Sequence, residues 1–304
     1  MKHDSRLARK IDAGDFIVTA ELLPQASTAI SEIEASATSL KKGITAVNVA
    51  DNPHGPVLSS LAGSLVLVKA GMEPVYQIVT RDRNRIAIQS DLLGAEALGI
   101  RNVLCLSGHH QALTGSPESA NVYDIDSIQL IAAVKQMRDQ RVLLDGTEIK
   151  GDFPVLIGAV AGPDMKPLEL NILRLAKKVE AGAEFIQTQA VFDVEAFENW
   201  LEQARNQEIT ANTAILAGVM PLSSYEEAET LRDKYMDLSI PDRILERLKK
   251  AGDEASQKQE GLTICIETIK KIKKMDGVRG LHILSGGKES LVSEIIASSD
   301  LMAS

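Results

Sequence analysis

Cysteine is scarce in this chain. Only Cys105 and Cys265 occur among 304 residues, and each lies in an apolar segment far from the other. A disulfide framework or a thiolate metal site would need more cysteines at closer spacing. The pair therefore argues against both, and favours the reducing environment of the cytoplasm.

Long apolar runs and an excess of positive charge are also missing. No apolar run reaches the length of about 18 residues that is needed to span a bilayer. Met1 to Lys10 is charged and lacks the apolar core of a signal peptide. The formal net charge of −9 argues against a nucleic-acid binder, which usually presents a basic face. We therefore expect a cytoplasmic protein that binds neither membranes nor nucleic acids.

Linkers are absent as well. No stretch rich in Pro, Gly or Ser and no low-complexity tract divides the chain. Hydrophobic residues make up 44% and charged residues 25%, an ordinary balance for a chain that buries one core. Residues 1–304 are therefore expected to form a single domain.

Short apolar runs recur along the whole chain, with amphipathic helical patterns between them. Runs of this kind predict strands that are covered on both faces. Eight strands alternating with at least eight helices are typical of a (β/α)8 TIM barrel. A doubly wound open sheet is the alternative, but the GxGxxG fingerprint after the first strand is absent. The eight predicted strands are Phe16 to Ala20, Ile44 to Val49, Pro74 to Val79, Asn102 to Leu106, Pro154 to Val160, Phe185 to Thr188, Ala214 to Gly218 and Gly280 to Leu284.

Two segments are longer than ordinary connections. Ser107 to Asp126 is polar and follows the fourth predicted strand, where a long loop is usually functional or mobile. Arg141 to Asp152 precedes the fifth strand, which places it on the opposite face. We interpret it as a hairpin or surface excursion without a catalytic role.

The polar residues at the carboxyl ends of the strands are the candidates for chemistry, because barrel active sites lie at that face. Glu21 follows the first strand between apolar neighbours. Such surroundings disfavour the ionised carboxylate, which suits a general acid near neutral pH. A Glu that hydrogen-bonds a neighbouring backbone group explains the same position equally well.

Amide side chains lie at the end of the sixth predicted strand, and guanidinium side chains follow the third. Gln187 and Gln189 could read the edge of a heterocycle or could anchor a loop. Arg81, Asp82 and Arg83 open a charged stretch that could clamp an anion. An internal salt-bridge network at the barrel rim is the alternative for that stretch.

His109 and His110 follow the fourth strand and could be acid/base groups or metal ligands. No HxH or HExxH spacing accompanies them, and adjacent residues point in different directions, so no metal site is expected. Gly286-Gly287-Lys288 precedes a helix, where backbone amides could hold a phosphate. A helix start that needs two glycines explains this pattern as well.

Taken together, these pieces resemble the methylenetetrahydrofolate reductase family, and most closely its short microbial forms. The resemblance runs from about Phe16 to Leu284. The strings that carry it are Val18-Thr19-Ala20-Glu21 with Pro24, Arg81-Asp82-Arg83-Asn84 leading into Gln89 to Gly94, Leu98 to Leu104, Lys178 to Ala183 with Phe185 to Gln189, Phe192-Asp193, and Gly218 to Leu222.

The resemblance implies a barrel that holds a flavin, usually FAD, and reduces 5,10-methylenetetrahydrofolate to 5-methyltetrahydrofolate. It implies that Glu21 and the position of His109 are catalytic and that Gln189, with Gln187 beside it, contacts the pterin. It also implies a homo-oligomer. The residues that would help to hold the cofactor are Asn52, Arg81, Asp82, Arg83, Asn84, Gly108, His109, Asn171, Arg174, Lys177 and Lys178.

The chain departs from the family pattern around the cofactor. His109 follows Gly108 where the family carries an Asp, so an imidazole replaces a carboxylate beside a developing cation. Other departures are Ala50 for Thr, Gln77 for His, Asn171 for Asp, and Gly162 to Pro167 for a Tyr-Pro-Glu-x-His-Pro segment. FAD, FMN and no flavin therefore all stay open.

Two other functions are compatible with the sequence. A pterin-binding barrel could transfer a methyl group, or reduce folate without flavin. A non-catalytic subunit could dock onto a redox partner through an exposed apolar stripe, for which Ile240 to Leu248 is the candidate. The electron donor also stays open between NADH, NADPH, ferredoxin and a partner subunit, because no separate nucleotide motif is present.

Overall fold

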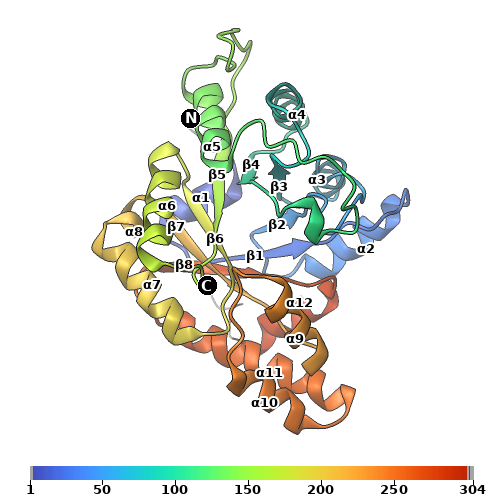
Figure 1. Cartoon of the computed structure of the whole chain (residues 1–304). Coiled ribbons are helices and arrows are strands. Elements are labelled where there is room, and N and C mark those ends of the chain that lie inside the picture. Colours follow the sequence, from blue (N-terminus) through green and yellow to red (C-terminus); the bar gives the residue numbers. More distant parts are fainter. Residues whose placement is uncertain (1–2, 300, 302–304) are drawn as a thin grey trace.

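The chain folds as a closed barrel of eight parallel strands in sequence order, with helices around it, which confirms the predicted (β/α)8 fold (Figure 1). The computed structural model describes residues 3–299 and 301. None of the helices in this part of the chain is long and apolar enough to cross a membrane. The strands are β1 (Ile17–Leu22), β2 (Ala46–Val49), β3 (Pro74–Val79), β4 (Asn102–Leu106), β5 (Leu156–Ala161), β6 (Phe185–Ala190), β7 (Ala214–Val219) and β8 (Val278–Ile283).

All eight predicted strands are present, and two of them extend two residues further at their carboxyl ends than predicted. β1 continues two residues past Ala20 and β6 continues two residues past Thr188. Glu21 and Gln189 therefore lie within strands, so the barrel wall fixes their backbones. The side chains of both face inward, because alternate residues of a strand point to opposite faces.

Helices cover the outside of the barrel, and helix capping follows local sequence. Ser224 caps α9 by accepting a hydrogen bond from the Glu227 amide. The Glu227 carboxylate itself accepts a hydrogen bond from the Ser223 amide. The helices are α1 (Arg6–Ala13), α2 (Ile30–Leu40), α3 (Ser60–Lys69), α4 (Arg85–Ala97), α5 (Ser127–Asp139), α6 (Leu168–Ala181), α7 (Val194–Asn206), α8 (Ile209–Asn212), α9 (Tyr225–Lys234), α10 (Asp242–Ala251), α11 (Glu254–Ile272) and α12 (Glu289–Ser298).

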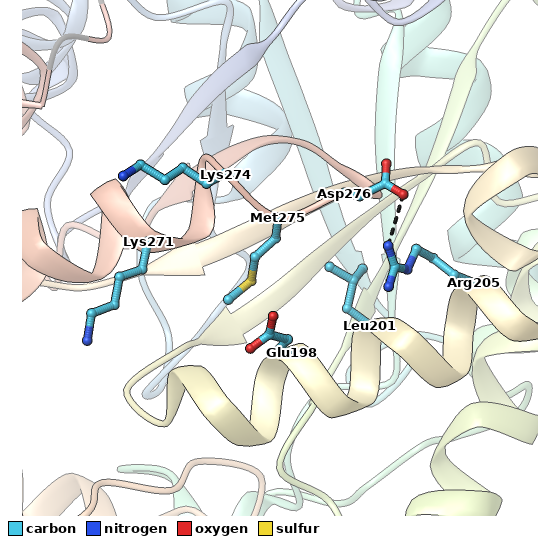
Figure 2. A pocket seen from close by; sticks show the side chains of 7 residues that line it. All are labelled: Glu198, Leu201, Arg205, Lys271, Lys274, Met275 and Asp276. Atoms are coloured by element: carbon cyan, nitrogen blue, oxygen red, sulfur yellow. Dashed lines mark hydrogen bonds and ion pairs between the residues drawn. The ribbon is translucent and has the colours of Figure 1, made fainter.

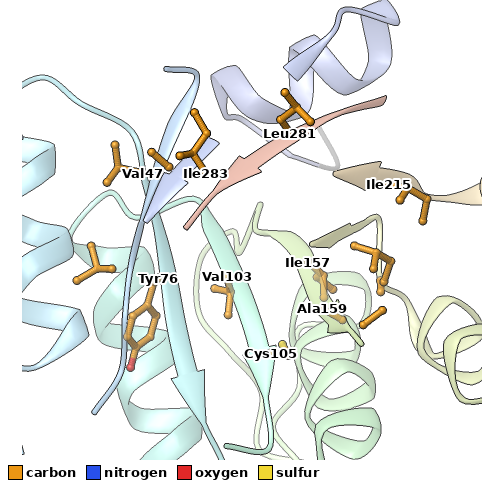
Figure 3. Packing of buried hydrophobic residues seen from close by; sticks show 14 of the residues in the cluster. Val47, Tyr76, Val103, Cys105, Ile157, Ala159, Ile215, Leu281 and Ile283 are labelled. Carbon is orange, nitrogen blue, oxygen red and sulfur yellow. The ribbon is translucent and has the colours of Figure 1, made fainter. Parts of the chain in front are cut away.

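The outward-facing residues of the strands form the larger core, which is packed under the helices. Figure 3 shows members of this cluster, such as Tyr76 of β3, Ile157 of β5 and Leu281 of β8, projecting from different strands of the barrel. Each of these three side chains is fully buried. Burial of this kind contributes about 1.5–3 kcal/mol for each large apolar side chain.

The inward-facing residues form a second, smaller core at the amino ends of the strands. Phe185 and Leu104 are among its members, and Leu7 of α1 packs against them. Gly158 is required there, because a Cβ at this position would lie 2.2 Å from the Phe185 ring. Helix α1 therefore closes the amino-terminal end of the barrel.

A polar layer lies inside the barrel above this apolar floor. The Gln187 amide donates to Asn48 Oδ1 and Thr19 Oγ1, both at 3.1 Å, and Asn48 Nδ2 donates back to Gln187 Oε1 at 2.6 Å. His282 Nδ1 lies 3.0 Å from Thr19 Oγ1. Burial lowers the pKa of His282 to about 3, so this imidazole is neutral at physiological pH.

The long segment before β5 and the apolar stripe both have defined structures. Residues 141–152 form a hairpin closed by an antiparallel bridge between Val142 and Glu148, as predicted, and it projects beyond α5 in Figure 1. In the stripe from Ile240 to Leu248, the side chains of Ile240, Ile244, Leu245 and Leu248 are all buried in a cluster with residues of α9 and α11. This stripe is therefore core and offers no exposed docking face.

Candidate active site

Glu21 lies at the carboxyl-terminal mouth of the barrel, partly buried and facing inward. Its carboxylate makes no hydrogen bond or ion pair with any residue in the part of the chain that the structure describes. Burial, and then the nearby carboxylate of Glu289, raise the pKa of Glu21 to about 7. A carboxyl group with this pKa is protonated in a large share of molecules at neutral pH and can donate that proton. The backbone hydrogen bond that the alternative interpretation requires is not formed among the described residues.

The polar segment 107–126 folds back over the strands next to the mouth. Its backbone is tied to the end of β3 by a hydrogen bond from the Val122 amide to the Arg81 carbonyl at 2.8 Å. The Tyr123 hydroxyl donates to the Gly108 carbonyl at 3.0 Å. His109 and His110 point in different directions, as predicted. His110 caps a short 3-10 helix (Gln111–Leu113), whereas His109 faces Asp237.

The arginine stretch after β3 is bound up in internal ion pairs. Arg81 is 2% exposed and binds the Asp82 carboxylate through Nε and Nη2, at 2.8 and 2.9 Å. Two further N–H groups donate to the carbonyls of Asn52 and His109. Asp82 also accepts from Asn52 Nδ2 at 3.2 Å. These contacts are those that the salt-bridge alternative requires, and they use four of the five N–H donors of Arg81.

The next residues of the stretch are engaged in the same way. Arg83 pairs with Asp51 and with Asp91, and Arg85 pairs with Asp124. Asn84 caps α4, because its side-chain oxygen accepts from the first amides of that helix. The stretch thus connects the loops that follow β2, β3 and β4 at the rim of the barrel.

The two glutamines of β6 have different surroundings. Gln187 is 1% exposed, and its whole amide is paired within the polar layer described above, so it acts as an anchor inside the barrel. Gln189 is partly exposed at the mouth, and its Nε2 donates to Asp237 Oδ2 at 2.9 Å. Gln189 is therefore the glutamine within reach of a ligand.

Asp237 belongs to this site, although no sequence pattern points to it. It lies in segment 235–241, which connects α9 to α10 and is distant along the chain from the end of any strand. Its Oδ2 is also 3.7 Å from His109 Nε2. Burial alone would raise the pKa of Asp237, but the interactions with His109 and Gln189 outweigh burial and lower it, so the group is anionic.

A cavity of about 110 Å³ lies between the end of β5 and the start of α6. Asn171 is engaged there, because its Nδ2 donates to the carbonyls of Gly162, Pro163 and Met165. Lys178 donates to the Val160 carbonyl at 2.5 Å, and burial together with Arg174 lowers its pKa to about 8. Arg174 and Lys177 are exposed and make no ion pair within residues 3–299 and 301.

The residues that the resemblance assigns to a flavin do not form a flavin cradle as they lie. The polar groups of these residues already bind one another, the Asp51 carboxylate, loop carbonyls or the first amides of α4. The residues are Asn52, Arg81, Asp82, Arg83, Asn84 and Asn171. A Cβ at Gly108 would lie 3.2 Å from Arg81 Cβ, so this glycine serves close packing. We therefore assign no chemical step to a flavin.

Two further features lie outside this site. A larger cavity of about 320 Å³ is lined by Glu198, Leu201 and Arg205 of α7 and by Lys271, Lys274, Met275 and Asp276 around the end of α11 (Figure 2). These residues precede β8 or end α7, so the cavity is away from the carboxyl ends of the strands. At Gly286-Gly287-Lys288, the Lys288 ammonium pairs with Glu227 at 2.6 Å, which supports the structural interpretation of that pattern.

Fold and site together define a (β/α)8 barrel with a carboxyl group and an amide at the mouth, a class that processes small molecules. The family model for methylenetetrahydrofolate reductase matches residues 6–300. The chain belongs to the methylenetetrahydrofolate reductase family.

Curated relatives support this assignment. The chain is 27% identical over 242 residues to a probable methylenetetrahydrofolate reductase (NADPH) of Caenorhabditis elegans, covering 79% of this chain and 34% of that protein. It is 26% identical over 187 residues to the 5,10-methylenetetrahydrofolate reductase of Escherichia coli (strain K12), covering 60% of this chain and 55% of that protein. The chain thus spans about a third to a half of the length of these relatives.

Solved structures of similar shape share the fold. An uncharacterized protein from Clostridium thermocellum, described as binding two copies of 5-methyl-5,6,7,8-tetrahydrofolic acid, superposes with a TM-score of 0.65. The identity is 18%, and the superposition covers 98% of this chain and 99% of that one. An oxaloacetate acetylhydrolase superposes with a TM-score of 0.51 at 12% identity, covering 97% of this chain and 85% of that one.

Proposed function

We propose that this chain is an oxidoreductase that binds a tetrahydrofolate at the mouth of the barrel and reduces 5,10-methylenetetrahydrofolate to 5-methyltetrahydrofolate. The observation that carries the proposal is Glu21, a carboxyl group that has a pKa of about 7 and no partner among residues 3–299 and 301, in a chain of this family. A reduction of this kind needs a proton as well as a hydride, and Glu21 is the group suited to supply the proton.

The chemistry balances with Glu21 as a general acid. The Glu21 carboxyl donates its proton to N10 of the substrate, the bond between N10 and the methylene carbon breaks, and N5 becomes a cationic iminium. A hydride then adds to that carbon and gives the 5-methyl group. The Glu21 carboxylate regains a proton from water for the next turnover.

In this proposal, Gln189 binds the pterin. Its amide lies at the inward face of β6 with one end held by Asp237 and the other end without a partner in the described part of the chain. An amide held in this way can hydrogen-bond the edge of a heterocycle. The folate-binding description of the Clostridium thermocellum protein is in line with such a ligand.

For the hydride, we propose a dissociable donor such as a reduced nicotinamide instead of a resident FAD or FMN. The reason is that Arg81, Arg83 and Asn171 already bind carboxylates or a loop carbonyl. They are therefore not arranged as a set of hydrogen-bond donors for a flavin. Arg174 is an exposed cation that lines the α6 cavity, and Lys177 is exposed on the same helix. These cations would attract the phosphates of the donor.

The visible absorption spectrum of the purified protein, taken with NADH and NADPH oxidation assays, tests this proposal. A colourless protein that oxidises a nicotinamide only when 5,10-methylenetetrahydrofolate is present would support it. A flavin spectrum that is bleached by reductant and restored by the folate would keep the reductase but overturn the dissociable donor. A protein that turns over no folate with any donor would overturn the reductase itself.

A second function is favoured by the Clostridium thermocellum structure, whose description names a bound methylated folate. In this version the chain holds 5-methyltetrahydrofolate and serves methyl transfer, or carries it for a redox complex. Tight binding of 5-methyltetrahydrofolate without any reduction activity would distinguish this version from the reductase.

A further inference from the structure

Segment 235–241 lies against the carboxyl ends of β4, β5 and β6. Asp237 contacts Gln189 of β6 and faces His109, which follows β4. The Ser239 amide donates to Asp164 Oδ2, after β5, at 3.0 Å. Three neighbouring strand ends therefore hold a segment that comes from after the seventh strand.

The packing beneath this segment is close. A Cβ at Gly162 would lie 3.2 Å from Asp237 Cβ. The Tyr235 ring packs on the His109 ring with centroids 5.2 Å apart. Asp237 is 21% exposed, so its position is set by packing on one side and open to the mouth on the other.

The carboxylate of Asp237 decides which way the Gln189 amide is turned. An ionised carboxylate only accepts hydrogen bonds, so it can bind only the NH2 end of an amide. Gln189 Nε2 is the atom that Asp237 binds. Gln189 Oε1 is left as an acceptor that has no partner among residues 3–299 and 301.

We propose that Asp237 is a positioning residue of this site. It fixes the Gln189 amide with its carbonyl oxygen free, so that the site selects a heterocycle that presents N–H donors, such as the aminopyrimidinone edge of a pterin. This inference rests on the proposed function for the identity of the ligand, and on the contacts of Asp237 for the selection.

A double-mutant cycle on binding of 5-methyltetrahydrofolate, measured by calorimetry, tests the proposal. Asp237→Ala is expected to weaken binding by about tenfold, because the amide loses its charged partner and its orientation. Asp237→Asn still offers an oxygen to Gln189 and is expected to stay within about threefold of wild type. Gln189→Ala should cost as much as Asp237→Ala, and the double variant should cost little more than either.

Asp233→Asn is the matched control. It removes one negative charge four residues earlier, at a side chain that is 69% exposed and paired only with Arg232 in the described part of the chain. Binding equal to wild type is expected. Two outcomes would overturn the positioning role. In one, the losses of affinity in Asp237→Ala and Gln189→Ala multiply in the double variant; in the other, Asp237→Ala binds within about twofold of wild type.

A readout without ligand separates this inference from the proposed function. In nuclear magnetic resonance spectra of the unliganded protein, the Gln189 side-chain amide protons should be shifted and slow to exchange, and Asp237→Ala should abolish both features. If wild type binds no folate but this difference is present, the proposed function fails and the positioning stands. If the two proteins give the same Gln189 signals, the positioning is wrong.

Discussion

Arg83 binds the Asp51 carboxylate through two hydrogen bonds, from Nη1 to Oδ2 at 2.6 Å and from Nη2 to Oδ1 at 3.1 Å. Asp51 also accepts from the Val79 amide at 3.0 Å, and its side chain is fully buried. The pair thus joins the loop after β2 to the loop after β3. Arg83, within the charged stretch 81–85, is therefore part of the framework of the barrel rim.

Replacing Arg83 should therefore lower stability before it affects ligand binding. Arg83→Leu leaves the Asp51 carboxylate buried without its partner, and we expect a loss of about 3 kcal/mol or more in the free energy of unfolding. Arg85→Leu is the control, because the Arg85–Asp124 pair is 50% and 31% exposed and should contribute little to stability. Urea denaturation measures both. Unchanged stability in Arg83→Leu, with weaker nucleotide binding, would instead indicate an anion clamp.

Glu21→Gln should abolish proton donation and keep the fold. We expect kcat to fall by about 10²–10⁴-fold while the affinity for 5-methyltetrahydrofolate is retained. Because the pKa of Glu21 is raised to about 7, wild-type kcat should decrease as pH rises above 7, where the carboxyl is ionised. Steady-state rates between pH 5.5 and 9 check this, and a flat profile would exclude Glu21 as the acid.

The same raised pKa has an effect on stability. The folded state binds the Glu21 proton more tightly than the unfolded chain, so stability is lost as pH rises from the unfolded pKa toward about 7. Glu21→Gln removes this loss, and at pH 8 it should unfold with a free energy higher than wild type by about 1–3 kcal/mol. Urea denaturation at pH 5 and pH 8 compares the two proteins. A stability difference that does not change with pH would contradict the assigned cause.

Gly162→Ala should displace the segment that carries Asp237. The added methyl would lie 3.2 Å from both Asp237 Cβ and Met165 Cγ, so one of them must move. We expect weaker binding of 5-methyltetrahydrofolate by about threefold to tenfold and a loss of roughly 1 kcal/mol in stability.

Gly94→Ala is the matched control for that variant. Gly94 lies inside α4, and a Cβ there would meet nothing within 4 Å. Because alanine is the better helix former, this variant should be more stable than wild type by roughly 0.5–1 kcal/mol with unchanged binding. Equal binding in both variants would show that the packing at Gly162 does not hold Asp237 in place.

Most of the fold could be predicted from the sequence, because buried parallel strands leave continuous apolar runs that turn residues interrupt. Glu21 and Gln189 could be chosen for the same reason, since each directly follows such a run. Asp237 could not, because its segment follows α9 and reaches Gln189, 48 positions away, only through tertiary packing. The pairing of Arg81 and Arg83 was also undecided, since a sequence does not show which carboxylates a guanidinium meets.

Helix α1 closes one end of the barrel with Leu7 and Ala8, and this has a consequence for kinetics. Because α1 covers that end, we expect ligands to approach the barrel from the opposite end, where Glu21 lies. If the hydride comes from a dissociable donor, as proposed above, folate and donor must lie at this end together, because the hydride then passes directly from one to the other. Initial-rate plots are therefore expected to give intersecting lines, whereas parallel lines would indicate a resident hydride carrier.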